Sequence, residues 1–194
     1  MSKTITVYTF DELSDEAKER AMRTLPEPDC QHTLDECIAS LKALCEHAGV
    51  ALKDWNLGPE RYRSFVKVEI GNSVSGDEPE ALTGHRAFAW IENRIFGPLR
   101  QPWSLRAKGR KYTRPGHVPA CPLTGVCFDE DLLDVFRDRD HRITIKDRFR
   151  SLADVIARIC ESELEYQASD EYRKEYADSY FDGAMFTEDG RRVS

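Results

Sequence analysis

The residues best suited to chemistry form one basic segment that also contains aromatic residues. Residues 93–128 include seven Lys or Arg residues and no Asp or Glu, whereas the whole chain of 194 residues has a formal charge of -7. By subtraction, the remainder carries -14. Cationic side chains neutralise phosphates and aromatic faces stack on bases, so this mixture favours a nucleotide or a single-stranded nucleic acid as the ligand. The predicted ligand-binding residues are Arg100, Trp103, Arg106, Lys108, Arg110, Lys111, Tyr112 and Arg114.

The same cations allow a second interpretation. They can pair with the acidic remainder of the chain, either within one protomer or across a homodimer. Salt distinguishes the two interpretations, because phosphate binding weakens steeply as salt is added whereas an apolar protein interface does not. Both interpretations stay open on the sequence alone.

Metal and thiol chemistry have weaker support in the sequence. His117, Cys121 and Cys127 give the pattern H-x3-C-x5-C, which matches none of the usual zinc spacings, and no C-x-x-C pair occurs. A cysteine nucleophile needs a histidine and a third, orienting group, and no third group can be identified. The acidic run 129–131 lies where a helix N-terminus favours anions, which explains it without a metal. We therefore expect no cofactor, no metal and no catalytic residue.

Periodicity indicates the elements that position the basic segment. Alternation predicts a first strand at 4–10, a hairpin of 50–57 with 62–70, and a last strand at 183–187. Helical spacing with capping residues predicts helices that begin after Ser14, at a Thr33–Glu36 capping box, near Glu80, near Asp129, after Thr144 and after Ser169. Cys37 and Cys45 fall on the apolar face of the second helix and are expected in its core.

These elements predict one α+β domain covering residues 1–194. We expect a small antiparallel sheet that includes the N- and C-terminal strands, with several helices packed on it. The basic segment is predicted to be a long loop rich in Pro and Gly, inserted at about 97–127, in which 104–112 could form a short hairpin.

The composition also bears on location. No apolar run is long enough to span a bilayer, and the first ten residues lack the basic start and apolar stretch of a signal peptide. Six cysteines in this length are far fewer than a disulfide scaffold contains, so they are expected to be thiols. The sequence therefore predicts a cytosolic protein that has no membrane partner.

Three patches resemble small accessory proteins of tailed bacteriophages and prophages, some of which are labelled antitoxin-like. They are VYTFDELSDEAKERA at 7–21, CPLTGVCFDEDLLDVF at 121–136 and YQASDEYRKEYADSYFDGAMFTEDGRR at 166–192. One departure lies in the tail, where the family more often has Asn-Glu-Tyr-Glu-Phe and this chain has Asp-Gly-Ala-Met-Phe at 182–186.

The resemblance implies a setting in phage biology, where small accessory proteins often antagonise host defence. It supplies no catalytic residues. The function expected on this basis is a non-catalytic binding protein that blocks a bacterial anti-phage system through the basic segment. Its target is expected to be a CRISPR effector complex or a signalling nucleotide that it sequesters. The alternative is an antitoxin-like or structural module that binds another protein without a phosphate ligand.

Overall fold

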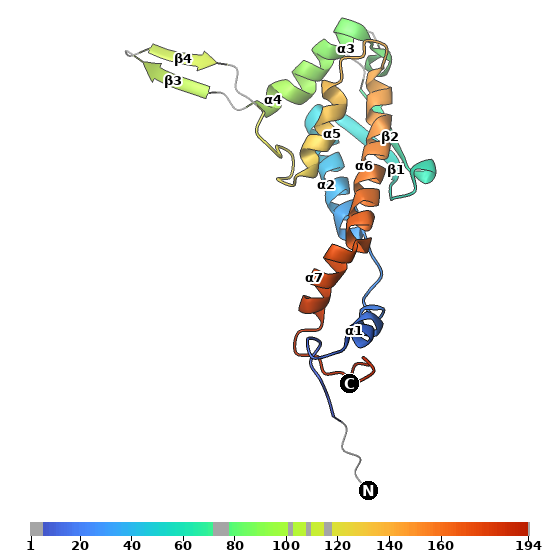
Figure 1. Cartoon of the computed structure of the whole chain (residues 1–194). Helices are drawn as coiled ribbons and strands as arrows, with labels where there is room; N and C mark the ends of the chain where they lie inside the picture. Colours follow the sequence, from blue (N-terminus) through green and yellow to red (C-terminus); the bar gives the residue numbers. More distant parts are fainter. Residues whose placement is uncertain (1–5, 72–77, 101–102, 108–109, 115–117, 194) are drawn as a thin grey trace. The chain divides into compact units, whose positions relative to one another are not determined.

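The computed structural model describes residues 6–71, 78–100, 103–107, 110–114 and 118–193, and for 103–107 and 110–114 it describes the backbone. The protein combines helices with antiparallel strands, so the predicted α+β class is confirmed (Figure 1). The chain divides into two compact units. We call Met1–Asp29 with Ser162–Ser194 the terminal unit, and Cys30–Glu161 the central unit. The single domain of 194 residues stays a prediction, and each unit is described by itself.

Two helices of the terminal unit begin at serine caps, as predicted. Ser14 Oγ accepts a hydrogen bond from the Ala17 amide at 3.3 Å, and α1 runs over Asp15–Met22. Ser169 Oγ accepts one from the Tyr172 amide at 3.2 Å, and α7 runs over Asp170–Tyr180. Each cap satisfies an amide that the first helical turn leaves without a backbone partner, so each fixes where its helix starts.

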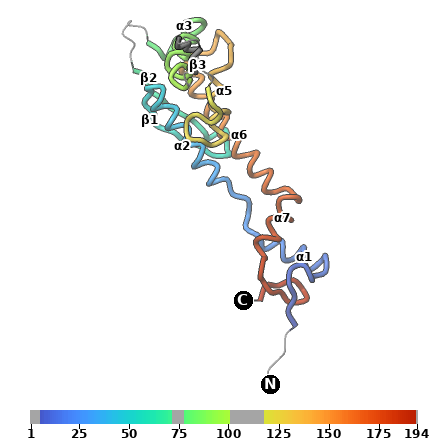
Figure 2. The backbone as a smooth tube through the Cα atoms, turned by 90° about the vertical axis from the view of Figure 1, so that its left-hand side faces the viewer, coloured from blue at the N-terminus to red at the C-terminus, as the bar shows by residue number. Residues whose placement is uncertain are grey.

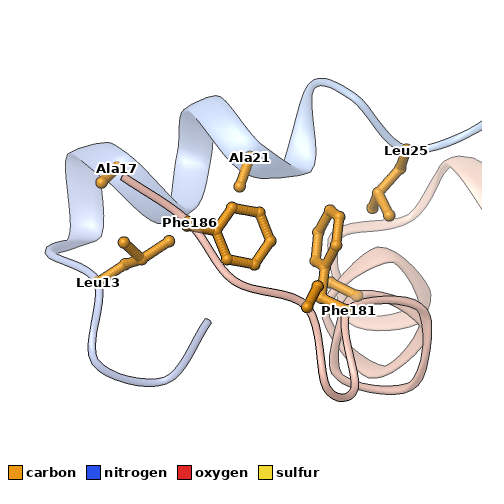
Figure 3. Packing of buried hydrophobic residues seen from close by; sticks show 8 residues of the cluster. Leu13, Ala17, Ala21, Leu25, Phe181 and Phe186 are labelled. Carbon is orange, nitrogen blue, oxygen red and sulfur yellow. The ribbon is translucent and has the colours of Figure 1, made fainter. Parts of the chain in front are cut away.

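The core of the terminal unit joins the two ends of the sequence. Figure 3 shows the rings of Phe181 and Phe186 beside α1, with their centroids 5.2 Å apart. The small side chains of Ala17 and Ala21, both fully buried, leave room for these rings against the helix. The N-terminal segment and the C-terminal tail therefore stabilise each other.

The predicted sheet containing the first and last strands is not confirmed in the described residues. The described part of the first segment pairs with the tail through a single antiparallel bridge, in which the Tyr8 and Phe186 amides bond each other's carbonyls at 2.9 and 2.8 Å. A second isolated bridge joins Phe186 to Arg192. A tail that turns back on itself within seven residues is too short for a continuous ladder, so the ends meet at bridges instead of strands.

Three helices build the core of the central unit. They are α2 (Gln31–Ala48), α5 (Phe128–Arg137) and the first part of α6 (Ile145–Ala168), which Figures 1 and 2 draw close together. The rings of Phe136 on α5 and Phe149 on α6 meet edge to face at 5.0 Å. Cys37 and Cys45 are buried as predicted, and burial raises the pKa of each thiol to about 12.

The start of α2 differs from the prediction. The helix begins at Gln31, with Cys30 as an N-cap that makes no side-chain capping bond, so the Thr33–Glu36 capping box does not form. Thr33 is buried within the first turn. The end is as expected, because Gly49 takes the left-handed conformation that stops a helix, with φ of 68°.

A two-stranded antiparallel sheet follows α2. β1 (Val50–Asn56) pairs with β2 (Phe65–Ile70), as the alternation predicts, with an irregularity between Leu52 and Asp54. Residues 61–63 form the 3-10 turn η1 instead of the start of the second strand. In β2 the side chains of Val66, Val68 and Ile70 are buried and those between them are exposed.

The helical stretch predicted from Glu80 is divided into short pieces. It consists of the 3-10 turn η2 (Pro79–Ala81), α3 (Gly84–Ile91), the π-helical turn η3 (Glu92–Phe96) and the single turn α4 (Gly97–Leu99). The Gly97 amide bonds the Glu92 carbonyl, and a Cβ on Gly97 would lie only 2.8 Å from that oxygen. Glycine therefore permits the π turn, a feature that is frequent at functional sites.

The basic segment is not one long irregular loop. It contains α4 and an antiparallel hairpin of β3 (Trp103–Ala107) and β4 (Arg110–Arg114) in the region 104–112 where a hairpin was the alternative (Figure 1). Backbone pairing between two nearby strands satisfies amide and carbonyl groups that an irregular loop would leave to water.

Gly190 generates a test of the terminal unit. Its φ is 80°, and a Cβ there would lie 2.2 Å from the Ala17 carbonyl oxygen, whereas Gly183, with φ of 70°, has open space around it. Gly183→Ala should cost about 1–2 kcal/mol through backbone strain alone. Gly190→Ala should cost at least about 2 kcal/mol more, because the tail must move away from α1. Urea unfolding of both variants measures this difference, and equal costs would contradict the close approach.

Candidate anion-binding site

A cavity in the described part of the central unit has a volume of about 960 Å³. Its walls come from α3, η3, α5 and the loop 138–144, and both Arg100 and Val118 line it. Arg100 precedes and Val118 follows the segment that contains β3 and β4. Both ends of this basic segment therefore start from residues of the cavity. The volume is in the range of pockets that bind small molecules.

The cavity combines aromatic surface with positive charge. The rings of Phe88, Phe96 and Phe136 line it, and of these Phe88 is partly exposed while Phe96 and Phe136 are buried. The ionisable side chains in its lining are Arg100, Arg137, Arg139, His85, His141 and Glu92. Three guanidinium groups against one carboxylate give a positive lining in a chain that is acidic as a whole. Such a surface attracts an anion, and a phosphate most readily.

The three arginines differ in how far they are neutralised. Arg100 forms a two-pronged ion pair with Glu92, in which Nη2 lies 3.0 Å from Oε2. Arg137 pairs with Glu130 at 3.3 Å and with Asp134. Arg139 has no ion pair with any residue in the described part of the chain. It is therefore the cation of the cavity best placed to receive a ligand's charge.

Two histidines lie at one side of the cavity. The His85 and His141 rings meet edge to face at 5.5 Å, and His141 also packs against Phe88 at 5.1 Å. The Gly84 amide donates to the His141 carbonyl at 2.9 Å, which holds the loop against the start of α3. His85 is exposed at the cavity.

A buried arginine fixes the wall from behind. Arg148 on α6 is 1% exposed, and its two Nη atoms donate to the carbonyls of Val135 at 2.7 Å and Asp140 at 3.0 Å. Its guanidinium carbon also lies 5.8 Å from the centre of the Phe88 ring. Arg148 thus contacts α3, the end of α5 and the loop that follows α5. These contacts hold the backbone on both sides of Arg139 in place.

A buried aspartate organises the approach to α5. Asp129 is fully buried and accepts hydrogen bonds from the amides of Leu123 and Thr124, both at 2.8 Å, and of Gly125 at 3.2 Å. The Ser40 hydroxyl on α2 donates to it at 2.6 Å. Burial raises the pKa of Asp129, but hydrogen bonds from Ser40 and Thr124 outweigh burial and hold the pKa below its usual value. The carboxylate thus joins α2, the turn 123–125 and α5.

The predicted ligand-binding residues are placed as follows. Arg100 lies at the cavity and is paired with Glu92. Trp103 and Arg106 belong to β3, and Arg110, Lys111, Tyr112 and Arg114 belong to β4, while Lys108 lies outside the described residues. The register sets Arg106 opposite Lys111 and Trp103 opposite Arg114.

Sequence reasoning missed most of the cavity. Arg139, His141 and Phe88 come from segments separated by about fifty residues, and no local pattern predicts that they meet. One feature could have drawn attention to this region, namely Asp129 shortly after Thr124 and Gly125, since a carboxylate often accepts hydrogen bonds from a nearby turn.

The cysteine interpretation gains no support from the electrostatics. Cys121 is partly buried, and desolvation together with Asp129 raises the pKa of its thiol. A raised pKa reduces the thiolate fraction that a nucleophile needs. His117 lies outside the described residues, and among those described no group of three His, Cys, Asp or Glu side chains could hold a metal ion.

No family model, curated protein or solved structure matches this chain. The likeness to phage accessory proteins therefore stays a prediction. In the part of the chain that the structure describes, no helix has both the length and the apolar composition that a membrane span requires.

Arg148 provides a test of how the cavity wall is held. Arg148→Met should lower the free energy of unfolding by about 2–4 kcal/mol, because the Val135 and Asp140 carbonyls lose buried donors. Arg158→Met is the control, since Arg158 is an exposed arginine on the same helix, and its replacement should change stability by less than about 0.5 kcal/mol. Urea unfolding measures both. Equal stabilities for the two variants would contradict this role of Arg148.

Asp129 provides a test that depends on pH. A carboxyl whose pKa is lowered by folding adds stability above its usual value of about 3.8, and this stability is lost as the pH falls through the lowered pKa. Asp129→Asn should therefore cost about 2–3 kcal/mol at pH 7 and clearly less at pH 3 or below.

Asp131 is the matched control, because burial and the neighbouring Asp134 and Glu130 raise its pKa. Asp131→Asn should leave the protein as stable at pH 7 or make it more stable. Urea unfolding of wild type and both variants at several pH values gives the comparison. A cost for Asp129→Asn that does not change with pH would show that the charge of Asp129 is unimportant.

Proposed function

We propose that this protein is a non-catalytic binding protein for a phosphate-bearing ligand. The cavity of the central unit receives the ligand, and the basic hairpin that joins the chain at this cavity supplies further positive charge. The observation that carries the proposal is Arg139, a cation in an aromatic cavity with no ion pair among the described residues. A nucleotide fits this chemistry, since its base can lie against the phenylalanines while its phosphate meets the guanidinium.

The role we propose within this class is the antagonism of a bacterial anti-phage defence system. Sequestration of a signalling nucleotide is the form that the cavity favours, because a volume of about 960 Å³ suits a small molecule. Direct contact of the basic segment with a CRISPR effector complex is the other form. The phage setting rests on the resemblance of the three sequence patches and not on the cavity.

A protein interaction module of the antitoxin-like kind is the second candidate. It is favoured by the ion pairs that already neutralise Arg100 and Arg137 within the central unit. Under this alternative the basic residues stabilise the fold and the partner is a protein. The two candidates differ in what they release on unfolding and in how binding responds to salt.

Native mass spectrometry of the protein purified from bacteria, before and after denaturation, tests the proposal. A nucleotide released on unfolding is the expected result. Titration of the ligand-free protein with a fluorescent ADP analogue should then show binding that weakens steeply with salt. Arg139→Ala should weaken this binding about tenfold, which is the size expected for one charge-assisted contact.

Arg142→Ala is the matched control, because Arg142 is three residues away, is exposed and pairs with Asp140 at 3.2 Å outside the cavity lining. It should change the affinity by less than twofold. A native mass equal to that of the protein alone, together with no binding of the analogue, would overturn the nucleotide proposal and favour a protein partner. Equal losses in both variants would mean that attraction is general and not located in the cavity.

A further inference from the structure

Among the described residues, one edge of the β1–β2 sheet is open. There, β2 pairs with β1 on one side only. On its other side the Ile70 amide donates to Glu80 Oε1 at 3.3 Å, so the backbone of Ile70 faces away from β1. Backbone groups of alternate residues in a strand face the same edge, which places the amides and carbonyls of Val66 and Val68 on this open edge as well. Neither residue has a backbone hydrogen bond to a described residue outside the sheet.

This open edge forms one wall of a groove. The groove has a volume of about 450 Å³ and is lined by residues 64–68 of the sheet and by Lys146, Arg150, Ala153 and Asp154 of α6. Five residues of extended chain span about 17 Å. A row of free backbone groups facing a helix across a groove is the arrangement in which proteins bind an extended peptide as an added strand.

The charges around the groove select the partner. Lys67, Lys146 and Arg150 contribute three cations against the one carboxylate of Asp154. Lys146 is paired with Glu80 and Arg150 with Asp147, while Lys67 is exposed and has no ion pair in the described part of the chain. A lysine at the free edge of a sheet disfavours pairing with strands that carry no negative charge. It attracts a strand that carries carboxylates.

We propose that this groove binds an extended acidic segment of a partner protein, which joins the sheet as a third strand beside β2. The backbone of the segment bonds Val66 and Val68, its carboxylates meet Lys67 and Arg150, and its remaining side chains enter the groove. A two-stranded sheet is only marginally stable by itself, so the added strand also stabilises the sheet. The groove shares no lining residue with the anion-binding cavity, and this inference does not depend on the proposed nucleotide.

A hexapeptide of alternating Glu and Val is the probe, titrated into the full-length protein labelled with nitrogen-15. The amides of Val66 and Val68 should shift and exchange more slowly with solvent, whereas those of Phe65 and Lys67, which face β1, should not. A hexapeptide of alternating Lys and Val should not bind. Shifts confined to side chains, or equal binding of both peptides, would overturn the proposal.

Backbone methylation gives the sharper control. Two isomers of the Glu–Val peptide carry methyl groups on the odd or on the even backbone nitrogens. Only one isomer should lose binding, because only one set of amides faces β2. Loss in both isomers or in neither would contradict strand addition.

Charge reversal tests the selection of an acidic segment. Lys67→Glu and Arg150→Glu should each weaken binding about threefold to fivefold, as expected for solvent-exposed ion pairs. Arg158→Glu on the same helix, outside the groove lining, should leave it unchanged. If a second copy of the chain covers the edge instead, the Val66 and Val68 amides will already be protected in the free protein at high concentration. That result would overturn the peptide proposal in favour of self-association.

Discussion

The central unit depends on one buried carboxylate. Asp129 accepts hydrogen bonds from three successive amides of the turn 123–125 and from the hydroxyl of Ser40. Because of these bonds, α2 and α5 cannot shift independently. An ionised group without such partners could not be buried, because the cost of removing its charge from water is large. Its hydrogen bonds offset that cost, and they also fix the direction in which α5 leaves the turn. The wall of the cavity that α5 provides follows from this geometry.

The chemistry of the cavity rests on incomplete neutralisation. Arg100 and Arg137 of the lining each pair with a carboxylate. The buried Arg148 donates hydrogen bonds to the backbone carbonyls of Val135 and Asp140. Arg139 lies between these two residues in the sequence. Arg148 thereby keeps the backbone around Arg139 in place without adding a carboxylate to the cavity. The backbone that carries Arg139 is therefore in place before an anion binds, which lowers the cost of reorganisation.

Local rules predicted the elements that local interactions decide. The serine caps of α1 and α7, the glycine at the end of α2 and the β1–β2 hairpin all follow from short patterns. The Thr33 capping box failed because the helix starts earlier and buries Thr33. The π turn at Gly97 and the bond from Ser40 to Asp129 depend on contacts between residues that no periodicity connects. The cavity could not be predicted for the same reason, since α3, α5 and the loop 138–144 meet only in the folded unit.

The three sequence patches 7–21, 121–136 and 166–192 consist largely of packing and turn residues. The first and third patches fold together in the terminal unit, where Phe186 bridges Tyr8 and Gly190 approaches Ala17. The middle patch contains the turn that Asp129 holds and most of α5. Arg139 and His141 of the cavity, and Lys67 and Arg150 of the groove, all lie outside the three patches. The charged residues that line the cavity and the groove therefore all lie between the patches, whereas Phe136 of the cavity lies within the middle one. Function is argued from these residues and not from the fold that the patches help to build.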